Sequence, residues 1–310
     1  MKCFQLIKKT LLLFIFISSV VHADDGVTRQ RDIIYGRKDG LALTMDVFTP
    51  PKARGIGVIW VISGSGRSSV ENIDKPSYQT CFKILLGRGY TIFAVIHSSA
   101  PRFSLQDMAA DVRRAVRFVR YQAGKFEIDA DRLGITGASA GGMLALLMGT
   151  TGQTEDPNQV DPVERMSSRV QAVGCFFGPS DWLDFDGRGT DILTFQKNKY
   201  GFIDPSFIFW EMDSNQKAYR QITDEQQYLI LLKELSPLAQ VTPDDAPTLL
   251  VHGDKDPFIP VQQAQRMAIV LEQVQVENRL VIREGKGHGW KQWEQDVSLL
   301  TDWFDEHLKQ

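Results

Sequence analysis

Continuous apolar runs recur along this chain and alternate with helix-like segments. A run without polar interruption is typical of a strand that is covered on both faces in a parallel sheet. Two shorter strand-like segments, residues 31–35 and 41–48, come first, and the turn dipeptide formed by Asp39 and Gly40 joins them as an antiparallel pair. The apolar runs that follow occupy residues 56–62, 91–96, 132–136, 170–177, 247–252 and 278–283.

The clearest predicted helix begins after Ser104. From there to Val119, apolar residues recur at spacings of three and four, and arginines lie on the opposite face. Ser104 and Asp107 have the spacing of a capping box. Further helices are predicted after Ala140, over residues 261–274 and over residues 290–308. Alternating strands and helices predict an α/β fold with a mostly parallel central sheet and helices on both faces.

Residues 181–245 interrupt this alternation. Ten aromatic residues crowd into the segment, and no clean strand or helix period runs through it. We interpret it as a lid-like insertion that packs over the edge of the sheet, with most of the aromatic rings forming a small core of their own.

The first 23 residues have the pattern of a secretory signal peptide. Lys2, Lys8 and Lys9 precede an apolar run that is too short to span a bilayer, and small residues follow at 21 and 23. The alternative is an uncleaved N-terminal anchor. With cleavage, residues 24–310 would form one large domain in a secreted or periplasmic protein, and its formal charge would change from −3 to −6.

Charge and cysteine content exclude some functions and leave one question open. A mildly acidic chain gives no electrostatic basis for nucleic-acid binding. Cys81 and Cys175 would both remain after export, and export would permit a disulfide between them. Two buried, unlinked thiols are the preferred interpretation, because Cys175 lies in an apolar run and two cysteines do not make a framework.

Candidate chemistry begins with the sequence GASAGG at residues 137–142. Gly137, Ser139 and Gly141 form the pattern G-x-S-x-G between a predicted strand and a predicted helix. In a nucleophile elbow, such a tight turn exposes the serine over the N-terminus of the helix, where free N–H groups stabilise negative charge. The alternative is a glycine-rich connection that only packs closely.

Two later loops supply partners for this serine. A serine nucleophile requires a base, and the base requires an acid that orients it. The sequence HGDKDPFIP carries Asp254 and Asp256, and GKGHGW carries His288; each follows a predicted strand. Ligands bind at the carboxyl ends of strands in open parallel sheets, and Ser, Asp, His is the order found in α/β hydrolases.

Four stretches together resemble the α/β-hydrolase-fold serine esterases, most closely the secreted carboxylesterase and acetyl-xylan-esterase-like group, which is related to the catalytic domain of prolyl oligopeptidases. They are LTMDVFTP, DADRLGITGASAGGMLAL, SPLAQVTPDDAPTLLVHGDKDPFIPV and GKGHGW. The resemblance implies an α/β-hydrolase fold with Ser139 as nucleophile and His288 as base. It also implies Asp256 as the orienting acid, because the family's acid lies three residues after the H-G glycine. Asp254 is then expected to be a turn residue that binds nearby backbone N–H groups.

The expected oxyanion hole departs from the family pattern. These enzymes often carry H-G-G-G after the third strand, whereas this chain has Ser63, Gly64, Ser65 and Gly66. Since the donors are backbone N–H groups, the missing histidine need not abolish the hole. We expect one donor at Ala140 and the other at Ser65, with Gly64 as the second choice.

The sequence therefore predicts a secreted serine hydrolase that cleaves a small-molecule or carbohydrate ester through an acyl-enzyme, with acylated polysaccharide fragments as candidate substrates. A prolyl-oligopeptidase-like exopeptidase and a non-catalytic binding module with this fold are the alternatives. Cofactors and metals are not expected, because the sequence has neither a phosphate-binding loop nor zinc-ligand spacing.

Overall fold

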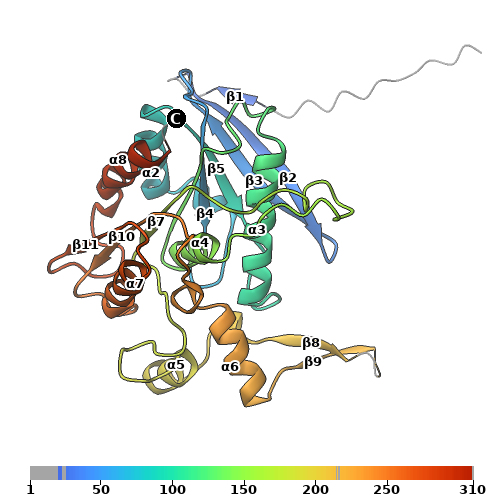
Figure 1. The fold of residues 1–310 in the computed structure, drawn as a ribbon, viewed down its shortest axis with the longest axis vertical. Coiled ribbons are helices and arrows are strands. Elements are labelled where there is room, and N and C mark those ends of the chain that lie inside the picture. Colours follow the sequence, from blue (N-terminus) through green and yellow to red (C-terminus); the bar gives the residue numbers. More distant parts are fainter. Residues whose placement is uncertain (1–19, 23–25, 214, 216, 309–310) are drawn as a thin grey trace, which may run out of the picture.

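The computed structural model describes residues 20–22, 26–213, 215 and 217–308 (Figure 1). In this part of the chain the central sheet has nine strands, in the order β1-β2-β3-β5-β4-β6-β7-β10-β11. Residues 1–19 and 23 of the predicted signal peptide lie outside the described residues. The strands are β1 (Val20–His22), β2 (Thr28–Lys38), β3 (Leu41–Thr49), β4 (Ile56–Ile62), β5 (Tyr90–Ile96), β6 (Leu133–Ala138), β7 (Ala172–Phe176), β10 (Thr248–Gly253) and β11 (Asn278–Arg283).

Most neighbouring strands in this sheet run parallel. From β5 through β4, β6, β7 and β10 to β11 every pairing is parallel, whereas β2, β3 and β5 pair antiparallel at the other side. The opening pair turns at Asp39 and Gly40, whose φ angles of 47° and 80° fit a tight hairpin. Each apolar run of the sequence coincides with a strand to within two residues at its ends.

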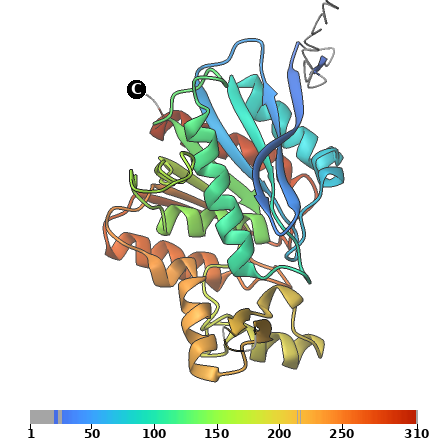
Figure 2. The ribbon, with the colours of Figure 1, turned by 90° about the vertical axis from the view of Figure 1, so that its right-hand side faces the viewer.

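Two hydrophobic layers join helices to the faces of the sheet (Figures 1 and 2). Alternate side chains of β4, such as Ile59 and Val61, pack with α3, α4 and α7 on one face. Val58 and Trp60 point the other way and pack with α2 and α8. The helices are α1 (Val70–Ile73), α2 (Pro76–Gly87), α3 (Leu105–Tyr121), α4 (Ala140–Thr150), α7 (Gln262–Gln273) and α8 (Val297–His307). This arrangement confirms the predicted α/β-hydrolase fold.

The capping box of α3 is present. The Ser104 side chain accepts a hydrogen bond from the Asp107 N–H, and the Asp107 carboxylate accepts one from the Ser104 N–H at 2.9 Å. The last predicted helix, residues 290–308, was too long. Gln292 adopts φ 66°, a left-handed conformation that interrupts a helix, so a 3-10 turn (Trp293–Asp296) precedes α8.

Residues 181–245, which we call the lid, hold α5 (Ile192–Tyr200), α6 (Glu225–Glu234), the hairpin of β8 (Trp210–Asp213) and β9 (Ala218–Gln221), and the 3-10 turns η1 (Pro205–Phe207) and η2 (Pro237–Gln240). Figure 2 shows the lid beyond one end of the strands. Trp182 and Phe207 of the lid line a cavity together with Ser139, which directly follows β6. The lid thus covers the edge of the sheet that the carboxyl ends of the strands form.

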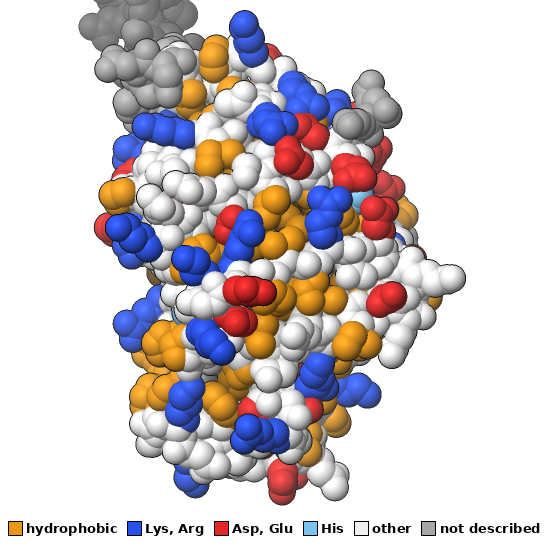
Figure 3. Space-filling view, turned by 90° about the vertical axis from the view of Figure 1, so that its left-hand side faces the viewer, with side chains coloured by type: hydrophobic (Ala, Val, Ile, Leu, Met, Phe, Trp, Pro, Cys, Tyr) orange, Lys and Arg blue, Asp and Glu red, His pale blue; other side chains and the backbone are white. Residues whose placement is uncertain are grey.

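The surface carries both signs of charge. Figure 3 shows Lys and Arg side chains interspersed with Asp and Glu on the face that lies to the left in Figure 1. Ion pairs at 2.8 Å join Arg88, at the end of α2, to the α8 residues Asp302 and Asp305. Among the described residues, no helix is long and apolar enough to cross a membrane.

Candidate active site

Ser139 lies in a strained turn between β6 and α4. Its φ of 55° and ψ of −123° are rare for a residue with a side chain. Two backbone hydrogen bonds hold it there, because its N–H donates to the Phe176 carbonyl at 2.9 Å and its own carbonyl accepts from the Met143 N–H at 3.0 Å. The turn directs the Ser139 side chain into the cavity beneath the lid.

The surrounding glycines are required by close backbone contacts. A Cβ atom on Gly137 would lie 2.5 Å from the carbonyl oxygen of Gly141, and one on Gly141 would lie 2.5 Å from that of Val61. A Cβ on Gly142 would lie 2.9 Å from the Cys175 sulfur. The GASAGG sequence therefore packs tightly and exposes its serine at the same time, as a nucleophile elbow does.

His288 joins the serine to a carboxylate. Its Nε2 lies 3.0 Å from Ser139 Oγ, and its Nδ1 lies 2.7 Å from Asp256 Oδ2. The loops after β11 and β10 bring these two side chains to the end of β6. The rings of Phe177 and Phe258 contact the imidazole edge-on, with centroids 4.8 and 5.6 Å away. Neither phenylalanine was predicted to be part of the site.

Asp256 is held as a buried, ionised acceptor. Its side chain is fully buried, and its Oδ1 accepts hydrogen bonds from the N–H groups of Phe258 and Ile259 at 2.8 and 2.9 Å. Burial by itself raises the pKa of Asp256, but hydrogen bonds with His252 and His288 and from the Ile259 N–H outweigh it, so the pKa is well below its ordinary value. An ionised partner at Nδ1 keeps the proton there and leaves Nε2 free to accept one.

Asp254, the rival acid, has a different position. Its Oδ1 accepts a hydrogen bond from the Gly285 N–H at 2.6 Å, which ties the loop after β10 to the loop that carries His288. Gly253 lets these loops approach, because a Cβ there would lie 2.4 Å from the Lys286 carbonyl oxygen. The structure therefore brings Asp256, and not Asp254, to the imidazole.

The loop after β4 supplies one of the two backbone N–H groups expected to form the oxyanion hole. The Gly64 N–H donates to the Arg67 carbonyl at 2.9 Å, so the second-choice donor is occupied and Gly64 is excluded. Ser65 and Gly66 form the turn with φ of 49° and 65°. In the described part of the chain, the N–H groups of Ser65 and of Ala140, the first residue of α4, have no hydrogen-bond partner, and both residues line the cavity with Ser139.

Neighbouring loops hold the strained Ser65 in place. The Gly66 carbonyl accepts from the Ala100 N–H at 2.9 Å. The Ser68 N–H donates to Ser99 Oγ at 2.9 Å, and the Ser68 hydroxyl donates to the Ile62 carbonyl at the end of β4. These contacts hold Ser65 in a left-handed conformation that glycine adopts more readily than serine.

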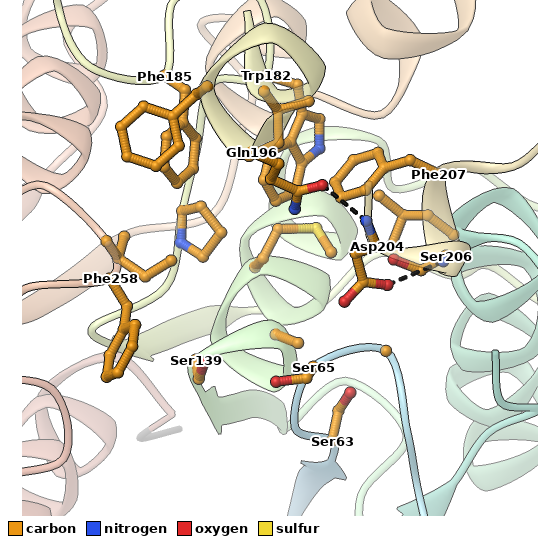
Figure 4. A pocket seen from close by; sticks show the side chains of 18 of the residues that line it. Ser63, Ser65, Ser139, Trp182, Phe185, Gln196, Asp204, Ser206, Phe207 and Phe258 are labelled. Atoms are coloured by element: carbon orange, nitrogen blue, oxygen red, sulfur yellow. Dashed lines mark hydrogen bonds between the residues drawn. The ribbon is translucent and has the colours of Figure 1, made fainter. Parts of the chain in front are cut away.

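The cavity above Ser139 has a volume of about 490 Å³ and mostly apolar walls (Figure 4). Six of the ten lid aromatics line it, so the prediction that most of them form a separate core was only partly right. The polar side chains Gln196 and Asp204 also face this space, and the sequence carried no signal for them beyond the turn-forming pair Asp204-Pro205. The six aromatics are Trp182, Phe185, Phe195, Tyr200, Phe202 and Phe207.

The remaining histidines and thiols have structural surroundings. His97 is buried and its Nδ1 lies 2.5 Å from the Ser98 carbonyl oxygen, while His252 Nε2 lies 3.0 Å from that of Ile259. Cys81 and Cys175 are both buried and unlinked, as predicted, and burial raises the pKa of Cys175 to about 12. Within the described ranges, no group of three His, Cys, Asp or Glu side chains could hold a metal ion.

Several known proteins resemble this chain. A protein-family model described as BD-FAE matches residues 45–271, which is more than half of the chain. The chain is 29% identical over 60% of its length to the probable carboxylic ester hydrolase LipM of Mycobacterium tuberculosis, and 27% identical over 58% to the uncharacterized peptidase YuxL of Bacillus subtilis. It spans 38% and 23% of the lengths of these relatives.

A solved structure shares the fold. A truncated carbohydrate esterase from gut microbiota superimposes with a TM-score of 0.71 over 93% of this chain and 99% of its own, at 22% identity. At this identity the likeness establishes the fold alone. The family model also spans β4, β5, β6, β7 and β10 and contains the loops of Ser65, Ser139 and Asp256. The chain therefore belongs to the BD-FAE family of α/β-hydrolase esterases.

Proposed function

We propose that this protein is an exported serine hydrolase of carboxylic esters, with Ser139 as nucleophile, His288 as general base and Asp256 as its orienting acid. One observation carries the proposal: the continuous contact from Ser139 Oγ to His288 Nε2 at 3.0 Å and from His288 Nδ1 to Asp256 Oδ2 at 2.7 Å. Support for the class of reaction comes from the name of the relative LipM. Export rests on the signal-peptide pattern of residues 1–23.

In the proposed reaction, His288 Nε2 takes the proton of the Ser139 hydroxyl as Oγ attacks the ester carbonyl carbon. The negative oxygen of the tetrahedral intermediate accepts hydrogen bonds from the N–H groups of Ala140 and Ser65. His288 then donates the proton to the departing alcohol, and the acyl group remains on Oγ. A water molecule, deprotonated by the same imidazole, then attacks the acyl carbon. The bond between that carbon and Ser139 Oγ breaks, His288 returns the proton to Oγ, and the carboxylic acid leaves.

Acylated carbohydrate fragments are the proposed physiological substrates. A cavity of about 490 Å³ can hold a sugar-sized group together with its acyl chain. Aromatic walls suit the apolar faces of a sugar ring or an aryl acyl group. The similarity to a carbohydrate esterase from gut microbiota supports the same class of substrate.

A fluorophosphonate probe tests the mechanism, because it labels only an activated serine. We expect the wild type to be labelled and to hydrolyse p-nitrophenyl acetate, and Ser139→Ala to lose both properties while it stays folded. Ser298→Ala, which changes an exposed hydroxyl that bonds only the Gln295 carbonyl, is the matched control and should retain both. Labelling that persists in Ser139→Ala, or folded wild type that is never labelled, would refute the proposal.

A serine exopeptidase is the second candidate, and the match to the peptidase YuxL is the observation that favours it. The same three side chains and two amides would then cleave an amide bond. Parallel assays with p-nitrophenyl acetate and with Ala-Pro-p-nitroanilide separate the two. Faster turnover of the anilide would favour the exopeptidase, whereas hydrolysis of the ester alone would exclude it.

A further inference from the structure

Asp204 is an unusual member of the cavity wall. It is the one acidic residue among the described residues that line the cavity, and that lining holds neither Lys nor Arg. Its neighbours there are mostly aromatic and aliphatic side chains. Since a carboxylate in apolar surroundings is costly unless something donates to it, this position calls for a partner.

The structure fixes Asp204 but leaves part of its carboxylate free. The residue stands at the start of η1, where its Oδ1 accepts a hydrogen bond from the Ser206 N–H at 2.9 Å. Its own N–H donates to the Gln196 side-chain oxygen at 2.8 Å. The second oxygen, Oδ2, has no hydrogen-bond partner in the described part of the chain. Figure 4 shows the carboxylate pointing into the cavity on the side of Ser65.

Asp204 also lies against the loop that holds the proposed oxyanion donor. A Cβ atom on Gly66 would be 2.9 Å from the Ser206 Cβ and 3.6 Å from Asp204 Oδ1. The lid thus contacts the residue next to Ser65 directly. A substrate whose carbonyl oxygen reaches the Ser65 N–H therefore has its neighbouring substituents within reach of the Asp204 carboxylate.

We propose that Asp204 selects substrates by accepting a hydrogen bond from a neutral hydroxyl group and by repelling carboxylates. This inference rests on the proposed ester hydrolysis. A substrate that fills the cavity displaces the water that hydrates Asp204. A substrate hydroxyl replaces the lost hydrogen bond to the carboxylate, whereas a hydrocarbon leaves the free carboxylate oxygen without a donor. A carboxylate on the substrate would meet the like charge of Asp204 in a described lining that holds neither Lys nor Arg.

The hydroxyl can belong to the alcohol or to the acyl part of the ester, and two series of substrates separate these sources. The alcohol series consists of cyclohexyl acetate, the monoacetate of 1,4-cyclohexanediol and 4-acetoxycyclohexanecarboxylate. The acyl series consists of the p-nitrophenyl esters of 3-phenylpropionate and its 4-hydroxy and 4-carboxy derivatives. Within each series the three esters differ only in whether they carry hydrogen, hydroxyl or carboxylate.

Asp204→Asn removes the charge but preserves an oxygen that can accept the Ser206 N–H, and Asp204→Ala removes the acceptor. In one series at least, both variants should lower the ratio of kcat/KM for the hydroxylated ester to that for the plain ester by about tenfold or more. The ratio for the carboxylated ester should rise. Asp191→Asn, which changes a lid aspartate that caps α5 and does not line the cavity, is the matched control and should leave every ratio within about twofold.

Unchanged ratios in both series, in an enzyme that hydrolyses the plain esters through Ser139, would overturn the role of Asp204 and leave the ester-hydrolase proposal standing. Wild type that hydrolyses none of the six esters would overturn both. Because each ratio is taken within one variant, partial loss of folded enzyme does not change it.

Discussion

Gly141→Ala is the substitution whose effect the structure defines most sharply. Gly141 lies in the first turn of α4, directly after Ala140, and the new Cβ would be 2.5 Å from the carbonyl oxygen of Val61 in β4. Ordinary contact for such a pair begins at 3.4 Å, so α4 and β4 must separate by about 0.9 Å. Ala140 is the first residue of α4 and Ser65 lies in the loop that follows β4, so the separation would move apart the two proposed oxyanion donors, the N–H groups of these residues.

Two magnitudes follow from that separation. Overpacking between buried elements costs about 1–3 kcal/mol, which should lower the free energy of unfolding by that amount. A misplacement of about 1 Å in a catalytic constellation costs about 100-fold in rate, so kcat for p-nitrophenyl acetate should fall by roughly this factor. KM should change less, because the lid and the cavity walls keep their contacts.

Urea unfolding and steady-state kinetics on the same preparation measure both effects. Gly87→Ala is the matched control, because a Cβ there meets nothing within 4 Å at the end of α2. It should keep kcat and change the stability by no more than about 1 kcal/mol. If Gly141→Ala has the urea midpoint and the kcat of the wild type, the close contact between Gly141 and the Val61 carbonyl does not position the site.

Three further predictions concern single side chains. Asp256→Ala should lower kcat by about 10³-fold or more, since it removes the partner of His288 Nδ1. Burial raises the pKa of Asp256, but its hydrogen bonds hold it below the ordinary 3.8, so ionised Asp256 stabilises the fold above that pH. Acidification from pH 6 to pH 3 should therefore shift the urea midpoint of the wild type more than that of Asp256→Ala, and equal shifts would contradict this. Asp254→Ala should lower the free energy of unfolding by about 1 kcal/mol, because the hydrogen bond from the Gly285 N–H is lost. Parallel kinetic assays should show a far smaller fall in kcat than for Asp256→Ala. Ser104→Ala should lower the thermal midpoint, at a cost of about 1 kcal/mol from the lost cap of α3, with unchanged kcat; an unchanged midpoint would argue against the capping box.

The elements that the sequence predicted well are those whose own residues determine them. Strand β4 is apolar at all seven positions and buried at all of them, so its bounds could be predicted without knowledge of its neighbours. The start of α3 was equally clear, because Ser104 and Asp107 satisfy each other within one turn. The candidate Ser139, Asp256 and His288 each follow such a strand, and parallel strands bring their ends together.

What could not be predicted depends on contacts between distant segments. Gly64 loses its role as a donor because Arg67 folds back onto it, and a short turn of this kind has no hydrophobic period to predict it. The residue types of the lid aromatics do not reveal which rings pack against one another and which line the cavity. Asp204 lies near the site because the lid packs against Gly66, far away in the sequence, where a Cβ would be only 2.9 Å from the Ser206 Cβ.

The two thiols give the protein an internal reporter of its own unfolding. Cys175 Sγ lies so close to Gly142 and Gly178 that a Cβ on either would be 2.9 or 2.7 Å away, and Cys81, a residue of α2, is fully buried. A thiol reagent can reach neither sulfur while β7 and α2 stay in place. In a chain without Cys3, the rate of modification therefore measures how often β7 or α2 leaves its place, at Cys175 and Cys81 respectively.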